Sequence, residues 1–313
     1  MLEEKRKVIL DTDIGDDIDD SFALLLLLES KKFDVLGVTT VFRNSKKRAM
    51  MAKEIIDSLG YDVKVYPGRD EPLRVKVDKL ISPEIKEREK LDEEGKYLIP
   101  QWDESMRNHK IEDKDAVDFI IEMVHKYPGE VTLIPIGPMT NIASAITKDP
   151  SIIPLIKEIR FMGAGLDLSF VEWNVFCDPD AAKIVLSSGV KKIEAITFNV
   201  TSKTEMSNEL IESLKNSNAK PIKLIYKAML KWFDHYKFSV PVMHDPLCVV
   251  SLLKEDVVEC KLLKMDVDLS QDGYTFINDK CNNIINVAIS VKTDDFYSIF
   301  KEILNVWFFT FSL

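Results

Sequence analysis

The sequence lacks the features of disulfide-rich, membrane-spanning and nucleic-acid-binding proteins. Its 313 residues include only four cysteines, without a CxxC pair or metal-like spacing, which indicates reduced thiols in a cytoplasmic protein. The longest apolar runs, at 22–28 and 306–311, are too short to cross a membrane, and the VIL run at 8–10 is too short for a signal peptide. The formal net charge is −10, so we expect no general attraction to nucleic acid or to anionic membranes.

Internal repeats, low-complexity tracts and obvious linkers are also missing, so we expect one domain over residues 1–313. Hydrophobic residues make up 46% of the chain, which is enough for a substantial core. Strand-like runs alternate with segments of helical periodicity, and these runs lie at 7–11, 35–41, 63–66, 131–136, 159–162 and 193–200. The alternation predicts an α/β fold with a largely parallel sheet covered by helices. Residues 261–291 alternate like antiparallel strands, and a helix from Asp294 follows them.

Residues 70–113 interrupt the alternation. They are rich in charge, with KEREKLDEEGK at 86–96, and they have little strand character. Long segments of this kind are either functional lids or surface decoration. We therefore predict an insertion over one edge of the fold, with both roles open.

An acidic cluster follows the first predicted strand. The stretch DTDIGDDIDD at 11–20 contains six aspartates and neither cysteine nor histidine. An oxygen-rich cluster of this kind suits a hard cation, Ca²⁺ or Mg²⁺. Gly15 permits a tight turn that would fold Asp13 back near Asp19 and Asp20. The alternative is a solvated acidic loop that caps the next helix.

Further polar groups follow the other predicted strands. They are Arg43-Asn44, the stretch 137–141, the EWN triplet at 172–174 and His244-Asp245. In open parallel sheets, ligands bind at the carboxyl ends of the strands. We therefore expect these groups to lie along one edge of the sheet. Asn141 and Asp178 are each expected to cap a helix instead.

Four motifs in this chain resemble those of the inosine–uridine-preferring nucleoside hydrolases, in the order found in that family. They are DTDIGDDIDD at 11–20, IGPMTNIA at 136–143, EWNVFCDPDAA at 172–182 and MHDPL at 243–247. The resemblance implies a Rossmann-like open sheet and a tightly bound Ca²⁺. It also implies an enzyme that hydrolyses the N-glycosidic bond of ribonucleosides to ribose and free base, and that assembles as a homodimer or homotetramer.

The resemblance further implies roles for individual residues. The calcium ligands would be the carboxylates of Asp13, Asp20 and Asp245 and the backbone carbonyl of Ile136. Asp13 would also accept a proton from a metal-bound water, the nucleophile, and His244 would assist the departing base. The ribose hydroxyls would be bound by Asp19, Asn44, Glu172 and Asn174. Apart from the resemblance, His235 and Tyr236 are candidates for the base pocket, although aromatic residues at helical spacing also suit a core. Trp173 lies between two proposed sugar binders and is a further candidate for the substrate site, with an orientation away from the site left open.

The chain departs from the commoner family pattern at two motifs. Ile14 stands where proline is usual, and three residues separate Gly15 from Asp19, as in a divergent branch of the family. These differences leave the roles of Asp16 and Asp17 open. Arg43 stands where a glycine is usual, and the base preference does not follow from the motifs.

Two other functions stay open on the sequence alone. A calcium- and ribose-binding homologue without turnover would bind ligand and release no base. A phosphatase of the haloacid dehalogenase type also begins with a strand, a DxD element and Mg²⁺. That pattern usually continues with Gly-Thr directly after DxD, whereas Ile14-Gly15 follows here.

Overall fold

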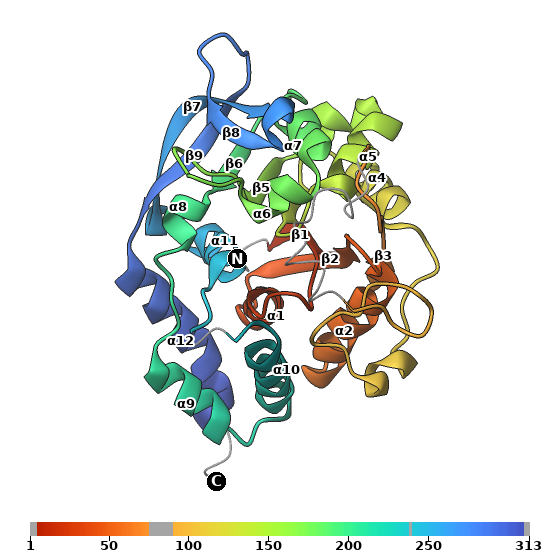
Figure 1. The fold of residues 1–313 in the computed structure, drawn as a ribbon, viewed down its shortest axis with the longest axis vertical. Coiled ribbons are helices and arrows are strands. Elements are labelled where there is room, and N and C mark those ends of the chain that lie inside the picture. The colour runs from red at the N-terminus through yellow and green to blue at the C-terminus, as the bar shows by residue number, and fades with distance from the viewer. Residues whose placement is uncertain (1–4, 75–89, 238–239, 310–313) are drawn as a thin grey trace.

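The computed structural model describes residues 5–74, 90–237 and 240–309, and in this part the strands form one nine-stranded sheet (Figure 1). The strands are β1 (Arg6–Thr12), β2 (Phe33–Thr40), β3 (Val65–Pro67), β4 (Thr132–Pro135), β5 (Glu158–Met162), β6 (Ile193–Ile196), β7 (Val258–Asp268), β8 (Tyr274–Ile277) and β9 (Ile284–Val291). Their spatial order is β3-β2-β1-β4-β5-β6-β9-β7-β8. Neighbours from β3 to β9 are parallel, whereas β7 is antiparallel to both β8 and β9. The predicted mostly parallel sheet with a small antiparallel C-terminal part is confirmed.

The strand order creates a switch point between β1 and β4. The chain moves outward from β1 through β2 and β3, and then returns to build β4, β5 and β6 on the other side of β1. Connections that leave two adjacent strands in opposite directions open a crevice at their carboxyl ends, where ligands bind in open α/β sheets. The acidic loop follows β1 and the IGPMTN motif follows β4, so both flank this crevice.

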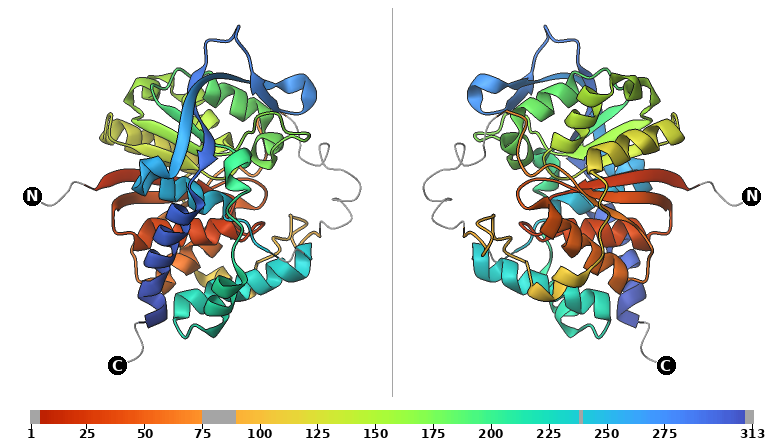
Figure 2. Two further views of the ribbon diagram at one scale, coloured as in Figure 1. Left: turned by 90° about the vertical axis from the view of Figure 1, so that its left-hand side faces the viewer. Right: turned by 90° about the vertical axis from the view of Figure 1, so that its right-hand side faces the viewer.

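Helices cover both faces of the sheet (Figures 1 and 2). One layer contains α1 (Asp19–Glu29), α2 (Ser45–Ser58), α9 (Asn208–Asn216), α10 (Lys220–Tyr236), α11 (His244–Leu253) and α12 (Thr293–Phe309). The other contains α4 (Ala116–Lys126), α5 (Thr140–Lys148) and α7 (Pro179–Leu186). Short helices α6 (Trp173–Cys177) and α8 (Phe198–Thr201) follow β5 and β6. Each layer has its own buried apolar cluster, so the sheet separates two cores.

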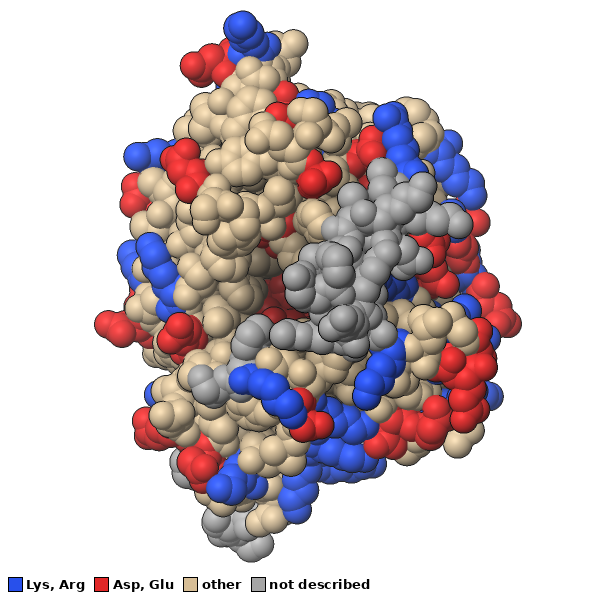
Figure 3. Space-filling model, in the orientation of Figure 1, with Lys and Arg blue, Asp and Glu red and all other residues tan. Residues whose placement is uncertain are grey.

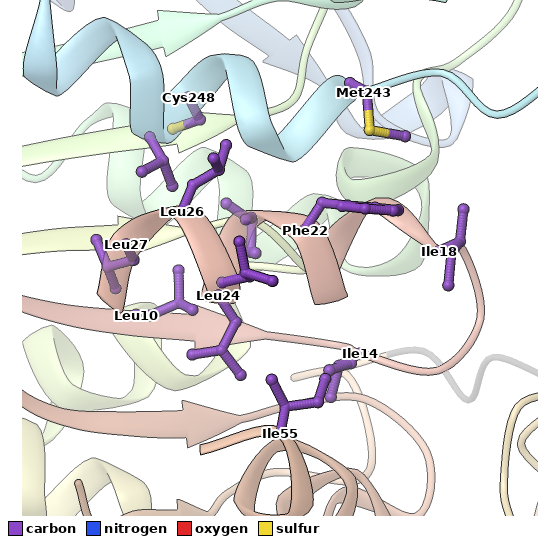
Figure 4. Close-up of a cluster of buried hydrophobic side chains, with 14 of the residues drawn as sticks. Leu10, Ile14, Ile18, Phe22, Leu24, Leu26, Leu27, Ile55, Met243 and Cys248 are labelled. Carbon is purple, nitrogen blue, oxygen red and sulfur yellow. The ribbon is translucent and has the colours of Figure 1, made fainter. Parts of the chain in front are cut away.

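Helix α1 is buried on every side. Its sequence DDSFALLLLLE lacks a polar face, as expected of a helix enclosed by other elements. Figure 4 shows the α1 side chains Phe22 and Leu26 beside α11, and Leu24 on the side of β1 and α2. Because α1 is held from both sides, its first turn, with Asp19 and Asp20, is fixed beneath the crevice.

The structure differs from the sequence predictions in several elements. The predicted strand at 193–200 ends at Ile196, because the chain turns at Thr197 and Phe198–Thr201 form α8; the Thr197 hydroxyl donates to the Ala288 carbonyl (2.8 Å). Helices α6, α9 and α11 were not predicted. Residues 75–89 of the predicted insertion lie outside the described residues, as do the first four residues of the chain. A membrane-spanning length of apolar helix is not found in the described part of the chain.

Candidate active site

A tight loop joins β1 to α1 and carries the acidic motif. Gly15 has φ +117°, and a Cβ at this position would lie 2.4 Å from the Ile99 side chain. Only glycine adopts this conformation without strain and also leaves the space. The turn predicted at Gly15 is therefore confirmed, and it returns the chain to the first turn of α1.

Three buried carboxylates meet where α1 and α11 begin. Asp19 and Asp20 lie in the first turn of α1 and Asp245 in the first turn of α11, and one ligand oxygen from each lies within 4.8 Å of the others. The Asp245 backbone N–H donates to Asp19 Oδ2 (3.0 Å), and the Thr12 hydroxyl donates to Asp20 Oδ1. Calcium–oxygen bonds are about 2.4 Å, so oxygens on opposite sides of one ion lie about 4.8 Å apart. The cluster therefore has the size and the oxygen-only chemistry for a hard divalent cation.

The electrostatics of this cluster also favour a cation. Burial, followed by the charge of neighbouring carboxylates, raises the pKa of Asp19, Asp20 and Asp245 well above the ordinary aspartate value. Burial likewise raises the pKa of Asp13 to about 7, although Arg48 lowers it. A divalent ion reverses this repulsion and holds such carboxylates ionised. The residues therefore fit a bound metal.

Asp13 lies next to this cluster, at the end of β1. Its side chain approaches Gly137 so closely that a Cβ on Gly137 would lie 2.6 Å from Asp13 Oδ1. The glycine of the second motif thus leaves room for the aspartate of the first. The three-carboxylate cluster contains Asp19, for which the family pattern implied ribose binding, whereas Asp13 stands beside it at the cavity.

The other aspartates of the motif have separate partners. Asp11 accepts hydrogen bonds from Thr39 Oγ1 (2.6 Å) and Asn141 Nδ2 (2.8 Å). It therefore connects β1 to β2 and to α5. The expected capping role of Asn141 is wrong, because its side chain donates to Asp11 rather than accepting from its own helix. Asp178 does cap α7, by accepting from the Ala181 N–H (3.0 Å). Asp16 and Asp17 both face the cavity.

A cavity of about 480 Å³ opens above the carboxylates. Figure 3 shows it as a hollow on this face of the molecule, with acidic side chains at its floor. Small-molecule sites usually have volumes of about 300–1,000 Å³ and apolar walls with few polar groups. The aromatic side chains around this cavity are those of Tyr97, Phe170, Trp173, Phe198, Trp232, His235, Tyr236 and His244. The acidic floor and aromatic wall suit a polyhydroxylated ring joined to a flat heterocycle.

Glu172 and Asn174 line the same cavity from the start of α6. Glu172 accepts hydrogen bonds from the backbone N–H groups of Ala164 (2.9 Å), Asn174 (2.9 Å) and Val175 (3.2 Å). Its two oxygens offer about four acceptor positions, so one stays available to a ligand. Asn174 Nδ2 donates to the carbonyls of Ile136 (2.9 Å) and Met162 (3.2 Å), which leaves its Oδ1 as an acceptor. Burial raises the pKa of Glu172 to about 7.

His244 lies at the start of α11, beside Asp245. Its Nδ1 is 2.7 Å from Thr201 Oγ1, and its ring stacks on Phe198 with centroids 5.4 Å apart. Burial lowers the pKa of His244 to about 4, so the imidazole is neutral at physiological pH. The neutral His244 ring is held at Nδ1 and lines the cavity.

The structure brings most of the predicted site residues together, with the exception of Asn44. Trp173, His235 and Tyr236 line the cavity, as do Asp13, Ile136 and His244. Asn44 is not among the described residues around the cavity, because its amide donates to Asp92 Oδ2 (3.1 Å) and to the Tyr97 carbonyl (3.1 Å). The arrangement therefore does not support the ribose-binding role predicted for Asn44.

Several cavity residues were not predicted to belong to the site. Phe198 lies two residues after the end of β6, so the rule about strand ends would have found it if the end of that strand had been predicted correctly. Arg43 was expected at this edge of the sheet, but no role was predicted for it, and Tyr97 belongs to the segment whose role was open. Phe170 has no signal in a single sequence beyond its place before Glu172.

Comparisons with known proteins identify the family of the chain. Residues 8–298 match the model of the family described as inosine-uridine preferring nucleoside hydrolase. The chain is 28% identical to the pyrimidine-specific ribonucleoside hydrolase RihB of Escherichia coli O9:H4 (strain HS), over 96% of this chain and 97% of the relative. A plant nucleoside hydrolase, PpNRh1, superposes with a TM-score of 0.82 at 25% identity, over 96% of this chain and 99% of that one. A purine-preferring ribonucleoside hydrolase from Gardnerella vaginalis superposes with a TM-score of 0.79 at 27% identity, with the same coverage. The chain belongs to the inosine-uridine preferring nucleoside hydrolase family, the family that its four motifs resemble.

Proposed function

We propose that this protein hydrolyses the N-glycosidic bond of ribonucleosides in a calcium-dependent reaction that releases ribose and free base. The observation that supports this most is the cluster of Asp19, Asp20 and Asp245 at the floor of an aromatic cavity of about 480 Å³. The cavity volume suits a nucleoside, and the acidic floor suits a metal and a sugar rather than a phosphate group. Membership of the family supports the same reaction.

The residues that would hold calcium are the three clustered carboxylates, together with Asp13 and the Ile136 carbonyl at the same cavity. All of these groups offer oxygen, which Ca²⁺ prefers. When bound, calcium supplies positive charge that acidifies water and orients hydroxyl oxygens. Calcium rather than Mg²⁺ is proposed because flexible coordination by several carboxylates suits the larger ion.

Asp13 would act as the general base. It lies at the end of β1 beside the cluster, and its position against Gly137 fixes its side chain at the cavity. A carboxylate there can accept the proton of an attacking water while the bond to the base breaks. Such catalysis is typically worth about 10²–10⁴-fold.

Glu172 and Asn174 would hold the ribose. Each keeps an acceptor that is not used by its backbone partners, and sugar hydroxyls are donors. The anionic floor also stabilises the positive charge that develops on the sugar ring as the glycosidic bond lengthens. These interactions are stronger in the transition state than in the ground state, so they raise the rate.

His244 would assist the departing base by donating a hydrogen bond from its Nε2. With its pKa lowered to about 4, the ring donates as a neutral imidazole at physiological pH, and Thr201 fixes its orientation. Trp173, His235 and Tyr236 would enclose the heterocycle. Aromatic faces bind flat bases by stacking.

The test is a reducing-sugar assay of the purified protein against a panel of purine and pyrimidine ribonucleosides, with p-nitrophenyl phosphate as the control substrate. We expect ribose release from at least one nucleoside and no phosphate release. Phosphate release with Mg²⁺ would favour the phosphatase alternative. Thermal stabilisation by nucleosides without ribose release would favour the non-catalytic binding alternative. A cytoplasmic location, a single domain, an insertion at 70–113 with both of its roles open, and a homodimer or homotetramer stay predictions.

A further inference from the structure

Arg48 is a fully buried arginine in α2 whose guanidinium lies behind the acidic loop. Its Nη1 donates to the backbone carbonyl of Asp13 and to that of Ile14 (3.0 Å). Its Nε donates to the carbonyls of Phe42 (2.7 Å) and Arg43 (3.2 Å). One side chain therefore joins the loop after β1 to the loop after β2.

Asp16 supplies the counter-charge that a buried guanidinium needs. Its Oδ2 accepts from Arg48 Nη2 at 2.8 Å, and its Oδ1 accepts from the Tyr97 hydroxyl at 3.0 Å. Gln101 Nε2 donates to the backbone carbonyls of Asp16 (3.1 Å) and Asp17 (2.7 Å). A buried charge is tolerated when it is paired and hydrogen-bonded in this way. Asp16 is therefore paired with Arg48 and Tyr97, and it does not belong to the cluster of Asp19, Asp20 and Asp245.

The hydrogen bonds of Arg48 affect the direction in which the Asp13 side chain points. The Asp13 carbonyl belongs to the peptide group that follows the Asp13 Cα atom, and the Ile14 carbonyl belongs to the next peptide group, so Arg48 restrains the peptide plane on the carboxyl side of Asp13 and the one after it. The side-chain direction of Asp13 depends on the first of these planes, since side chains project from the backbone at fixed angles. Asp19, Asp20 and Asp245, by contrast, lie on α1 and α11, whose packing holds them.

We propose that Arg48 is a positioning residue for this enzyme: paired with Asp16, it fixes the backbone on the carboxyl side of Asp13 and so aims the proposed general base at the cavity. This role rests on the proposed function. It also assigns Asp16, a residue of the lengthened first motif, to hold Arg48 rather than a metal. A lysine can replace this arginine only in part, because an ammonium group lacks the planar fork that reaches several acceptors.

The experiment compares Arg48→Lys and Arg48→Met with the wild type, and uses Arg160→Met as a matched control. Arg160 is also fully buried and pairs with Glu158 (2.8 Å) and Glu194 (3.1 Å), but it bonds to Ser251 toward the other end of α11. Each protein is saturated with calcium, and kcat and KM are measured by ribose release. The calcium Kd is measured by isothermal titration calorimetry.

We expect Arg48→Met to lower kcat about 100-fold, the scale expected for misplacement of a catalytic group by about 1 Å. KM should change by less than about threefold, because Glu172 and Asn174, at the start of α6, have hydrogen-bond partners other than Arg48. The calcium Kd should stay within about tenfold, because α1 and α11 hold the clustered carboxylates. Arg48→Lys should lie between the wild type and Arg48→Met in kcat, and Arg160→Met should keep the wild-type kcat.

An unchanged kcat in Arg48→Met would overturn the role of Arg48. If Arg48→Met does not fold, Arg48→Lys provides the test, and a wild-type kcat there would overturn it too. Equal losses of kcat in Arg48→Met and Arg160→Met would indicate general destabilisation and would also contradict the proposal. A wild-type protein that released no ribose would overturn both the proposed function and this inference, whereas an active wild type with a fully active Arg48→Met would overturn the inference alone.

Discussion

Asp13 is the residue on which the proposed proton transfer depends most directly. Asp13→Asn keeps the size of the side chain but removes its ability to accept a proton, so we expect kcat to fall by about 10²–10⁴-fold. We expect the fold to persist, because burial already disfavours the charged form of Asp13 and asparagine is neutral. Ribose release and circular dichroism of the purified variant measure the two effects.

The matched control for this substitution is Asp118→Asn. Asp118 is an exposed carboxylate of α4 that pairs with Lys148, on the face of the sheet opposite α1. Its replacement should leave kcat unchanged. An Asp13→Asn enzyme with the wild-type kcat would show that another group takes the proton from water.

The raised pKa values of the site carboxylates predict a link between calcium and protons. Burial raises the pKa of Asp13 to about 7, so this carboxyl is partly protonated near neutral pH, and burial and neighbouring carboxylates also raise the pKa of Asp19, Asp20 and Asp245. Calcium binds the ionised form and must displace these protons. The affinity for calcium should therefore rise with pH between 6 and 8, by about tenfold per pH unit for each proton released.

Calorimetric titration of calcium in two buffers with different heats of ionisation measures the number of protons released. The account predicts at least one proton per ion at pH 6 and fewer at pH 8. Equal affinities at the two pH values, with no release of protons, would show that the carboxylates are already ionised without metal.

At the scale of elements, periodicity and turn residues predicted most of the sheet and its helices. Helix α11 was missed because HDPLCVVSLL is apolar on all sides, and a short apolar run does not distinguish a buried helix from a buried strand. The end of β6 was missed because Thr197–Val200 continues the alternation, whereas in the structure Phe198–Thr201 form α8 and the Thr197 hydroxyl donates to the Ala288 carbonyl, which lies far away in the chain. Local pattern carries no information about such partners.

Helix α1 supports the site through its buried apolar side chains, so its packing can be tested separately from its carboxylates. Leu26 is fully buried between α1 and α11 (Figure 4). Leu26→Ala should lower the free energy of unfolding by about 2–5 kcal/mol, because it removes buried methyl groups and leaves a cavity.

Urea denaturation followed by circular dichroism measures this loss. The control is Leu230→Ala on α10, where the leucine is 49% exposed and the same change should cost much less. Equal losses at the two positions would contradict the account of α1 as an enclosed helix.

At the scale of the whole molecule, the fold joins groups that are distant in the sequence. The hydrogen bond between Asp19 and Asp245 spans 226 residues. The rule that ligands bind at strand ends predicted that these regions meet. It did not predict which side chains would point into the cavity. Asn44 shows the reason. It is the last of three successive residues with positive φ, 42–44, and in this local conformation its amide donates a hydrogen bond to Asp92.

The measurement that tests the central claim most directly is the reconstitution of ribose release by calcium. The protein is stripped with a chelator, calcium is added in known amounts, and the rate is followed on a ribonucleoside that the wild type hydrolyses. The account predicts that activity is lost on chelation and returns in full at one calcium ion per chain, and that Asp245→Asn needs far more calcium. Full activity in the stripped protein, or none after calcium is restored, would contradict it.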